Sequence, residues 1–504
     1  MSDIFNELNQ VFSGVIRTNN TAGQIFVTTD GLIRNAPGSA LYLQNTFYDV
    51  KVDGIVSTSS VDTGIFYNSS SSGITSKLSV GATGQVHGGF AGVYASHAVN
   101  VTNAGYIDGG TFGLRINGGA DAFTITNTGK IESAGSAITL LGTGKHTLTN
   151  KGVITGDVSG SNGQDIITNS GYLNGALSLG DGTDVVSNSG TIASNISLGD
   201  GADKFTNTGT LLSLSYISMG SGDDSFTGGK TDERVADEAG KDSYKLGDGV
   251  DIFLAIGTGS NDLNIDTVDG GSNTGADGKD GRAFGDIYFA NMAIASLYVN
   301  LDTKAFTNTA DYQNGHVLAA ATASGAEVGT DKIKGFEVVL TGAGDDIVVG
   351  NAANNDISTG GGTDVIYGGA GNDEINAGNG LDLIFGGLGA DFLNGGGVDA
   401  SADYFYYTSV KDSTVALAGR DTIQQFEDGK DVIDLNGVMF NLPSTISVDD
   451  AFNGVLGQGD VRVITTQQGW TVQVDVNGDR KVDMAIDVID SGHSNVSWSV
   501  ADFN

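Results

Sequence analysis

The sequence lacks several features that commonly stabilise or localise a protein. It has no cysteine and only 2 prolines in 504 residues, so disulfides and thiolate chemistry cannot contribute. No apolar run approaches the roughly 20 residues that a membrane-spanning helix needs. Basic residues are also scarce, because 24 Lys and Arg stand against 60 Asp and Glu. These absences exclude a disulfide-stapled fold and predict that the chain has no membrane span.

The acidic excess is large and uneven along the chain. The net charge is −36, yet residues 1–160 hold only 10 acids and 8 bases, so nearly all of the excess lies beyond residue 160. Such a surface repels nucleic acid and anionic lipid, and we expect no nucleic-acid partner. Multivalent cations are the more natural partner, since a bound metal can stabilise a secreted chain that has no disulfides.

Glycine, by contrast, is abundant. With 79 Gly and many short β-branched segments, the chain matches neither a helical globule nor collagen. A chain of 504 residues is too long for one ordinary compact core, which leaves several domains or one repeat architecture. The composition favours the repeat architecture and an all-β fold.

The N-terminal segment MSDIFNELNQVFSGVIR carries early acids and no basic n-region, so it does not read as a secretory signal peptide. A helical spacing is followed by its apolar residues Ile4, Leu8, Val11, Phe12 and Val15. This spacing predicts a short capping helix within residues 1–25. A membrane anchor is the alternative interpretation.

A ladder of glycines runs through residues 26–240. Rungs such as NTGKI, NKGVI and NSGYL recur about every 20 residues, and each places an aliphatic or β-branched residue two positions after its glycine. This period predicts a parallel β-helix, in which each coil stacks an inward apolar residue on the preceding coil. The central glycines are Gly31, Gly54, Gly84, Gly105, Gly129, Gly152, Gly171, Gly190 and Gly209.

Asparagine occupies one rung position in six successive rungs, at Asn103, Asn127, Asn150, Asn169, Asn188 and Asn207. Asparagine tolerates left-handed backbone conformations and can hydrogen-bond along a stack of identical side chains. We therefore interpret these residues as structural and not as ligands.

A second motif begins within the ladder, as GDGTDVV, GDGADKF, GSGDDSF and GDGVDIF. The first two copies are in phase with the 19-residue rungs, which would place Asp184 over Asp203. Asp181 would likewise lie over Asp200. Stacked carboxylates repel unless they are neutralised, so a cation between rungs is one interpretation and solvated Asp-Gly turns are the other. The candidate metal ligands are Asp181, Asp184, Asp200, Asp203, Asp223, Asp248 and Asp251.

Residues 241–340 lose the short period. The stretch DTVDGGSNTGADGKDGRAFGD reads as a Gly/Asp-rich connector. The segments SLYVNLDTKAF and TDKIKGFEVVL predict strands that resume the stack.

From residue 341 the sequence divides without gaps into six nonapeptides: TGAGDDIVV, GNAANNDIS, TGGGTDVIY, GGAGNDEIN, AGNGLDLIF and GGLGADFLN. Position six is aspartate in five copies and asparagine in the second copy: Asp346, Asn355, Asp364, Asp373, Asp382 and Asp391. Position eight is aliphatic in every copy, as Val348, Ile357, Ile366, Ile375, Ile384 and Leu393. The repetition predicts a short strand after each acid, with its position-eight side chain buried.

The spacing also points to a ligand. Glycines at positions two and four allow a tight turn that aims carbonyl oxygens inward, and the acid adds a carboxylate. If two nonapeptides complete one coil, Asp346, Asp364 and Asp382 lie on one edge, and Asn355, Asp373 and Asp391 lie on the other. Hard oxygen ligands in such number suit several Ca²⁺ ions better than Zn²⁺ or Mg²⁺. The candidate glycines are Gly342, Gly344, Gly360, Gly362, Gly369, Gly371, Gly378, Gly380, Gly387 and Gly389.

This block resembles the GGxGxDxUx repeats of the RTX (repeats-in-toxin) proteins, which bind Ca²⁺. The resemblance implies a parallel β-roll over residues 341–400, export by a type I secretion apparatus and folding in a calcium-rich exterior. The second nonapeptide departs from the pattern, because Asn351, Ala353 and Asn355 replace two glycines and the acid. Residues 401–504 resemble the C-terminal β-domain and uncleaved export signal of serralysin-type secreted proteins.

An enzymatic role finds little support in the sequence. A zinc protease is excluded because the chain has no H-E-x-x-H motif. A β-helix joined to RTX repeats also suggests an extracellular polysaccharide lyase or epimerase, and this remains the alternative hypothesis. Its candidate residues are Tyr94, His97, Arg115 and Asp121, which form no known motif and are better interpreted as ordinary surface residues.

The favoured hypothesis is an exported, calcium-binding structural protein that folds on extracellular Ca²⁺. It would self-assemble at the cell surface or in the matrix as a surface layer, a filament or an adhesin. Its expected partners are further copies of the chain in a homo-oligomer or lattice, the secretion apparatus and possible cell-surface glycans.

Overall fold

The computed structural model describes residues 6–8, 11–13, 16–19, 23–35, 38–44, 47–58, 61–69, 73–212, 215–255, 264–272, 285–310, 312–397, 401–439, 447–448, 460–489 and 498–503. The chain divides into two compact units, Met1–Asp248 and Gly249–Asn504. Helix among the described residues is confined to two short 3₁₀ turns, η1 (Leu417–Gly419) and η2 (Val500–Asp502). The described part of the chain contains no helix with the length and hydropathy needed to span a membrane.

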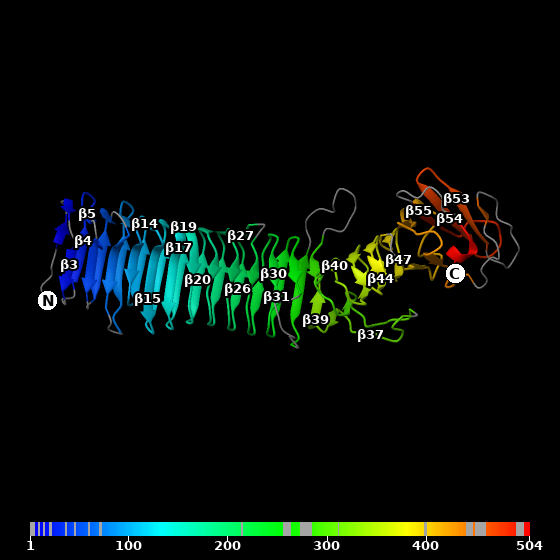
Figure 1. The fold of residues 1–504 in the computed structure, drawn as a ribbon, viewed down its shortest axis with the longest axis horizontal. Helices are drawn as coiled ribbons and strands as arrows, with labels where there is room; N and C mark the ends of the chain where they lie inside the picture. The colour runs from blue at the N-terminus through cyan, green and yellow to red at the C-terminus, as the bar shows by residue number, and fades with distance from the viewer. Residues whose placement is uncertain are drawn as a thin grey trace. The chain divides into compact units, whose positions relative to one another are not determined.

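The first unit is built from three series of parallel strands, stacked coil upon coil (Figure 1). The first series comprises β1 (Asn6–Leu8), β4 (Gly23–Val27), β7 (Tyr48–Val52), β10 (Ser76–Val80), β13 (Val99–Asn103), β16 (Phe123–Asn127), β18 (His146–Asn150), β20 (Asp165–Asn169), β23 (Val185–Asn188), β26 (Lys204–Asn207), β29 (Ser225–Thr227) and β31 (Ser243–Asp248). Each strand pairs in register with the equivalent strand of the next coil, as Ile167 does with Val186 and Val186 with Phe205.

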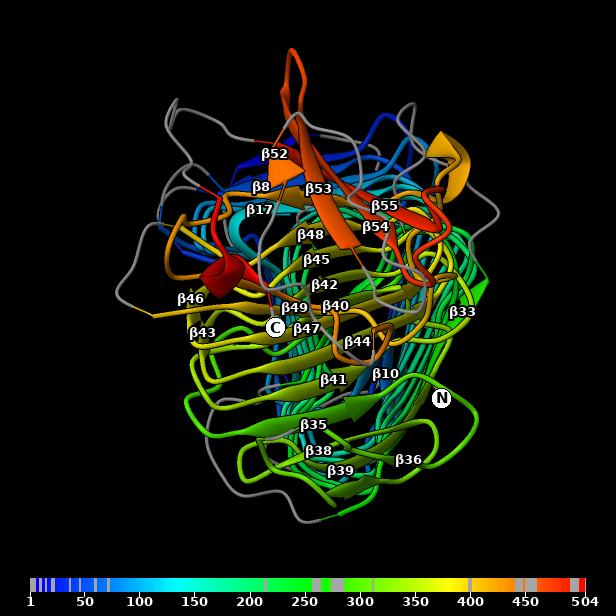
Figure 2. The same ribbon diagram turned by 90° about the vertical axis from the view of Figure 1, so that its right-hand side faces the viewer.

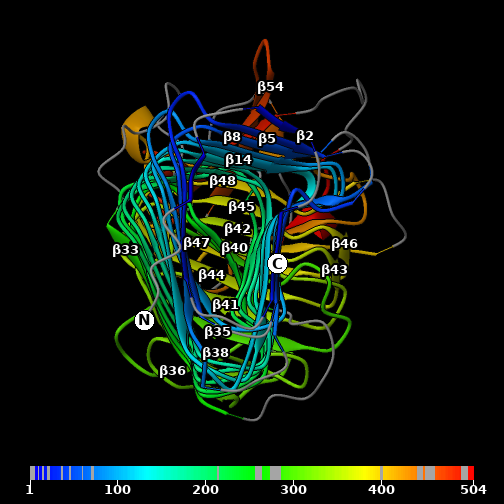
Figure 3. The same ribbon diagram turned by 90° about the vertical axis from the view of Figure 1, so that its left-hand side faces the viewer.

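The other two series share the long strands β17 (Lys130–Gly142) and β19 (Val153–Ser159). One contains β2 (Val11–Ser13), β5 (Leu32–Asn35), β8 (Ile55–Thr58), β11 (Gln85–Gly88), β14 (Tyr106–Gly109), β21 (Tyr172–Asn174), β24 (Thr191–Ile192) and β27 (Thr210–Leu211). The other contains β3 (Ile16–Asn19), β6 (Leu41–Gln44), β9 (Thr63–Asn68), β12 (Ala91–Ala95), β15 (Phe112–Gly119), β22 (Leu177–Ser178), β25 (Ile196–Ser197), β28 (Ile217–Ser218) and β30 (Arg234–Ala236). Figure 3 shows β5, β8 and β14 of the stacked coils one behind another.

The core of this unit confirms the predicted parallel β-helix. The residue two positions after each ladder glycine points inward and stacks on its neighbours. Such residues are buried in six successive coils, at Ile107, Ile131, Ile154, Leu173, Ile192 and Leu211. Each coil is too thin to bury a core alone, so its stability depends on the coils above and below.

The asparagine stack is also confirmed. The side-chain Nδ2 of Asn150 donates to Oδ1 of Asn169, and Nδ2 of Asn169 donates to Oδ1 of Asn188, each over 2.8 Å. The same 2.8 Å bond joins every neighbouring pair from Asn103 to Asn207. These side chains are buried, so the ladder satisfies polar groups inside the coils.

The predicted capping helix at residues 1–25 is wrong. The backbone there forms strands β1, β2 and β3, and their partners lie in the next coil, with Asn6 opposite Ile25, Val11 opposite Leu32 and Ile16 opposite Leu41. Short apolar runs fit both a helical and a strand period, and pairing with the neighbouring coil decides between them. The remaining residues of this segment, apart from those of β4, lie outside the described part of the chain.

The second unit contains two strand series, both visible in Figure 2. One comprises β33 (Thr267–Ser272), β39 (Gly329–Lys334), β38 (Thr322–Gly325), β35 (Leu297–Asn300), β41 (Ile347–Val349), β44 (Val365–Ala370), β47 (Leu383–Leu388), β49 (Tyr404–Tyr406) and β51 (Val432–Asp434). The other comprises β32 (Ile252–Leu254), β34 (Ile287–Phe289), β40 (Val338–Leu340), β42 (Asp356–Ser358), β45 (Glu374–Asn376), β48 (Phe392–Asn394), β50 (Thr422–Gln424), β55 (Met484–Ile489), β54 (Gly469–Asp475), β53 (Asp460–Thr465) and β52 (Ser447–Val448).

Most of these strands are parallel, but β38 runs antiparallel to both of its neighbours, and β53, β54 and β55 form an antiparallel meander. Two small pairs complete the unit, β36 (Phe306–Thr307) with β37 (Val317–Leu318) and β43 (Gly361–Gly362) with β46 (Asn379–Gly380).

The segments expected to resume the stack in residues 241–340 do form strands, as β35, β39 and β40. Most of the expected Gly/Asp-rich connector lies outside the described residues. The boundary between the two units, after Asp248, falls within this part of the chain. The five-part division predicted from the sequence, and the serralysin-like character of residues 401–504, stay predictions.

Candidate metal centre

The nonapeptides alternate between two edges of an 18-residue coil. Ile347 of β41 lies opposite Val365 of β44, and Val365 lies opposite Leu383 of β47. On the other series, Ile357 lies opposite Ile375, and Ile375 opposite Leu393. Two nonapeptides therefore complete one coil, as the sequence predicted. The position-six residue of each nonapeptide stacks on the position-six residue two nonapeptides later.

Glycine is required in the loops before these strands. Gly378 and Gly380 have φ angles of 102° and 132°, which other residues rarely adopt. A Cβ at residue 380 would also lie 1.7 Å from the carbonyl oxygen of Gly362, one coil away. Positive φ recurs at Gly360, Gly362, Gly369, Gly371, Gly387 and Gly389.

In the first nonapeptide, close approach constrains the glycines instead of positive φ. A Cβ at residue 342 would lie 1.9 Å from the carbonyl oxygen of Ala293, and one at residue 344 would lie 2.4 Å from the carbonyl carbon of Ala295. The loops of the block thus pack backbone against backbone.

The position-six acids form a ladder on each edge. The backbone N–H of Asp346 donates to Oδ1 of Asp364 over 2.8 Å, and that of Asp364 donates to Oδ1 of Asp382 over 2.9 Å. On the other edge, Asp373 N–H donates to Oδ1 of Asp391 over 2.9 Å. One carboxylate oxygen of each acid therefore fixes the register of neighbouring coils.

Both ladders continue past the nonapeptides. Asp382 N–H donates to Asp403 over 3.1 Å, and Asp403 N–H donates to Asp431 over 3.0 Å. Asp391 N–H donates to Asp421 over 2.9 Å. These three acids could not be predicted from the sequence, because residues 395–431 do not keep the nine-residue period.

The second carboxylate oxygen has a different environment. The Oδ2 atoms of Asp346, Asp364, Asp373 and Asp391 are buried and accept no hydrogen bond from the residues that the structure describes. Burial raises the pKa of Asp364 and of Asp373 to about 8, and in Asp364 the neighbouring carboxylates raise it further. Burial also raises the pKa of Asp346 and of Asp391 to about 6. A cation between the loops would reverse these shifts by compensating the charge.

The donor set fits a hard cation. The loops offer carboxylate and backbone carbonyl oxygens, and residues 341–394 contain no histidine or cysteine. Oxygen-only donors with several carboxylates are what Ca²⁺ prefers. The position-two and position-four glycines and the position-six acids would hold it.

Asn355 is the poorest fit among the predicted ligands. Its Oδ1 accepts the backbone N–H of Asn351 over 2.9 Å, and its Nδ2 donates to the carbonyl oxygen of Glu337 over 3.4 Å. The Oδ1 atom therefore closes its own loop, and the Nδ2 atom donates to the preceding coil, which a carboxylate could not do. A ligand role for Asn355 stays a prediction.

In the first unit the structure separates the predicted acids into two groups. Asp184 and Asp203 are buried and hydrogen-bonded to each other between neighbouring coils. The N–H of Asp184 donates to Oδ1 of Asp203 over 2.6 Å. Asp181, Asp200 and Asp223 are exposed. They bind Asn162, Ser221 and the N–H of Lys241 on the outer surface, so the structure does not bring them together with Asp184 and Asp203.

The buried position in the third copy belongs to Asp224, which the sequence analysis passed over in favour of Asp223. The fifth position of the G-x-G-x-D motif would have identified it. Asp248 ends β31 and is half-buried. Asp251 is buried, and its N–H donates to Oδ1 of Asp286 over 2.9 Å.

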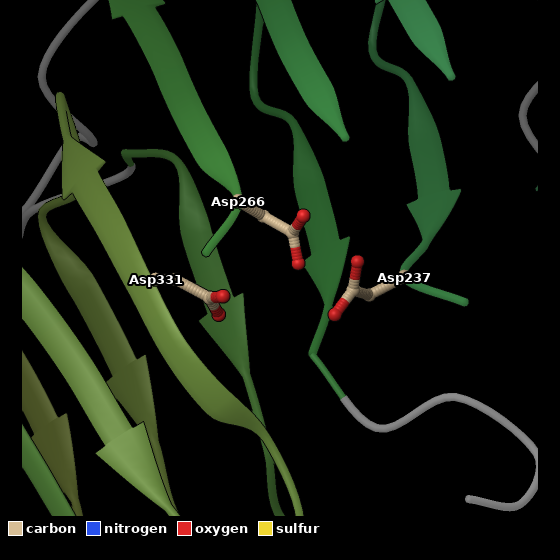
Figure 4. A group of neighbouring side chains, drawn as sticks. All are labelled: Asp237, Asp266 and Asp331. Atoms are coloured by element: carbon tan, nitrogen blue, oxygen red, sulfur yellow. The ribbon is translucent and has the colours of Figure 1, made fainter. Parts of the chain in front are cut away.

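A further acidic pair, absent from the sequence analysis, lies in the second unit. Asp266 precedes β33 and Asp331 lies in β39, and both are buried (Figure 4). A carboxylate oxygen of one lies within 4.8 Å of one of the other. Asp331 also accepts a hydrogen bond from the hydroxyl of Tyr288 over 3.1 Å. No sequence motif links two residues so far apart, so only the fold brings them together.

The residues proposed for an enzymatic site form contacts with different partners. Buried His97 binds the Ser76 hydroxyl over 2.9 Å, and burial lowers the pKa of its imidazole. Arg115 donates to the Tyr94 hydroxyl and stacks on the Tyr94 ring at 4.8 Å. Asp121 accepts the N–H of Gly73 over 2.7 Å. These contacts give the enzymatic hypothesis no convergent group of side chains.

Comparison with protein families gives one match. Residues 340–375 and 367–399 match the family model of the RTX calcium-binding nonapeptide repeat, with four copies. No curated protein matches the chain. The RTX nonapeptide repeats bind Ca²⁺, and the matched residues contain the stacked loops and the position-six acids described above.

Proposed function

The chain contains a block of RTX calcium-binding nonapeptide repeats, and we propose that Ca²⁺ bound between their stacked loops drives folding of this block outside the cell. RTX repeat proteins are typically secreted, which supports folding where Ca²⁺ is abundant. The proposal rests on the buried Oδ2 atoms of Asp346, Asp364, Asp373 and Asp391, which have no hydrogen-bond partner in the described part of the chain. An uncompensated buried carboxylate is costly, and a bound cation removes that cost.

Calcium couples to folding by mass action. The ligands of each ion come from different coils, so an unfolded chain has no assembled site, and binding stabilises the folded state alone. In the cytosol Ca²⁺ is scarce, and the net charge of −36 opposes compaction. Extracellular calcium modules bind at about 10⁻⁴ to 10⁻³ M, so the block would fold after export.

The Asp364→Asn variant tests this coupling. Loss of one buried charge should raise the calcium concentration at the folding midpoint about tenfold, equivalent to ~1.4 kcal/mol. The measurement is hydrogen exchange of residues 341–394 in the full chain, titrated with Ca²⁺ from a chelated start. Asp345→Asn is the matched control, because that acid lies in the neighbouring loop on the same edge but binds Tyr312 and the N–H of Thr363. Equal protection of the wild-type block in chelator and in calcium would overturn the proposal.

At the larger scale, the proposed role is structural: a calcium-stiffened protein that self-assembles at the cell surface or in the matrix. Support comes from the repeat architecture, which accounts for most of the described chain, and from a composition rich in glycine and poor in cysteine and proline. Parallel coils end in strands with unpaired edges, which favour stacking of one copy on another. Type I secretion and binding to a surface glycan belong to the same proposal.

Electron microscopy with and without Ca²⁺ tests assembly. Ordered sheets or fibres that disappear in chelator are the expected result. A chain that stays monomeric at every calcium concentration, while its RTX block folds normally, would refute the assembly role and leave calcium-coupled folding intact.

A further inference from the structure

The first unit contains its own column of buried acids, outside the residues that match the RTX repeat. The column has five members, one in each of five successive coils, at Asp165, Asp184, Asp203, Asp224 and Asp242. The N–H of each acid donates to Oδ1 of the next over 2.6–2.7 Å. This is the bonding pattern of the RTX ladders, although the coils here are 18 to 21 residues long.

Three acids of the column have an unsatisfied oxygen. Asp184, Asp203 and Asp224 have relative exposures of 0%, 2% and 3%. Their Oδ2 atoms are buried and have no hydrogen-bond partner within the described residues. Native proteins rarely leave several stacked carboxylates in this state, so each needs a cation or a proton.

Among the residues that the structure describes, a basic side chain meets the column at one end. His146 Nδ1 lies 2.8 Å from Oδ1 of Asp165, and both side chains are fully buried. This contact serves the first acid of the column. The lysines on the paired strands, Lys204 and Lys245, are exposed and so do not enter the interior.

The loops before the acids repeat the conformation of the RTX loops. Gly199 and Gly201 have φ angles of 101° and 155°, as compared with 102° and 132° for Gly378 and Gly380 in the RTX block. A Cβ at residue 201 would lie 1.4 Å from the carbonyl oxygen of Gly182. Each loop therefore presses its backbone onto the loop of the preceding coil.

We propose that the first unit binds a separate, one-sided column of Ca²⁺, held between the stacked loops 180–184, 199–203 and 220–224. The interior Oδ2 atoms of Asp184, Asp203 and Asp224 and the carbonyl oxygens of these loops are the ligands. Three loops enclose two inter-loop sites. The column is one-sided because the same strands end in neutral, mutually bonded asparagines such as Asn188 and Asn207. This inference rests on the proposed function in assuming that the folded chain meets extracellular Ca²⁺.

The test compares two triple variants of the full chain. Asp184→Asn with Asp203→Asn and Asp224→Asn removes the interior charges but keeps an Oδ1 acceptor. Asp181→Asn with Asp200→Asn and Asp223→Asn makes the same charge change in the same loops on the outer surface. Calcium stoichiometry is measured by titration calorimetry, and hydrogen exchange follows β23, β26 and β29 with and without Ca²⁺.

The interior variant should bind two fewer ions and lose the calcium-dependent protection of β23, β26 and β29. The surface variant should match the wild type. Protection of β13, β16 and β18, which precede the acid column, reports whether the interior variant folds. If that protection is lost, the single variant Asp203→Asn replaces the interior triple variant. Unchanged stoichiometry in the interior variant, or wild-type strands equally protected in chelator, would overturn the inference.

Residues 341–394 act as the internal reference. If they keep their calcium response while β23, β26 and β29 show none, the second column is refuted and the proposed function stands. If neither region responds, the proposed function itself fails.

Discussion

At the scale of single residues, the position-six aspartate uses its two carboxylate oxygens differently. Oδ1 accepts a backbone N–H from the neighbouring coil, and Oδ2 faces the interior of the loops. The neutral Asn355 does not take the first role, because its Oδ1 accepts the N–H of Asn351 within its own loop. It cannot replace the second role, because an amide brings no charge to a cation.

The buried and uncompensated Oδ2 oxygens predict an unusual pH dependence of stability when calcium is removed by a chelator. Burial raises the pKa of Asp364 and of Asp224 to about 8, from an ordinary value of 3.8. Between those values the folded state holds more protons than the unfolded state, so the free energy of unfolding falls as pH rises. The chelated chain should therefore have a higher Tm at pH 5 than at pH 8.

Calcium should abolish this trend, because bound ions keep the carboxylates ionised at both pH values. Thermal unfolding at pH 5, 6, 7 and 8, in chelator and in calcium, measures the difference. A Tm of the chelated chain that rises with pH would contradict the assignment of these acids as uncompensated.

At the scale of elements, the loop glycines set which substitutions the fold tolerates. Gly380 combines a φ of 132° with a Cβ position only 1.7 Å from the carbonyl oxygen of Gly362. Gly380→Ala should destabilise the second unit by at least about 1–2 kcal/mol, since the backbone is strained and the coils must separate. Urea unfolding in saturating Ca²⁺ provides the measurement.

Gly397→Ala is the control for Gly380→Ala, because a Cβ at residue 397 would meet nothing within 4 Å. It should leave the unfolding midpoint close to that of the wild type. A Gly380→Ala midpoint equal to the control would show that the loops are looser than their packing indicates.

Much of this arrangement could be predicted from the sequence, and the exceptions have physical reasons. The nine-residue phase alone gave the two edges, because two nonapeptides per coil put Asp346 and Asp364 in one ladder. The first 25 residues misled because their apolar spacing suits a helix, while pairing to the next coil makes strands. Asp403 and Asp421 could not be predicted, since they join the ladders only after loops of irregular length.

At the scale of the whole molecule, charge and calcium are expected to oppose each other. The net charge of −36 favours an expanded chain, and ions bound in the interior neutralise the acids that resist compaction. Small-angle scattering should therefore show a smaller radius of gyration in Ca²⁺ than in chelator. Sodium chloride of equal ionic strength should reproduce only part of this change, because screening does not fill the sites.

An equal radius in calcium and in chelator would mean that the interior acids are neutralised without an ion. Magnesium is a useful second control, since it keeps its waters and fits poorly between loops that offer protein oxygens alone.

The asparagine ladder of the first unit has a polarity. Every amide from Asn103 to Asn207 donates in the same direction along the stack, so the amide dipoles align as peptide dipoles do in an α-helix. The donor end is partially positive, and there Nδ2 of Asn207 donates to Oε1 of Glu233 over 2.8 Å. A carboxylate in that place is the counterpart of an acidic N-cap. The row of uncharged side chains thus behaves as a single extended dipole that ends on the carboxyl group of Glu233.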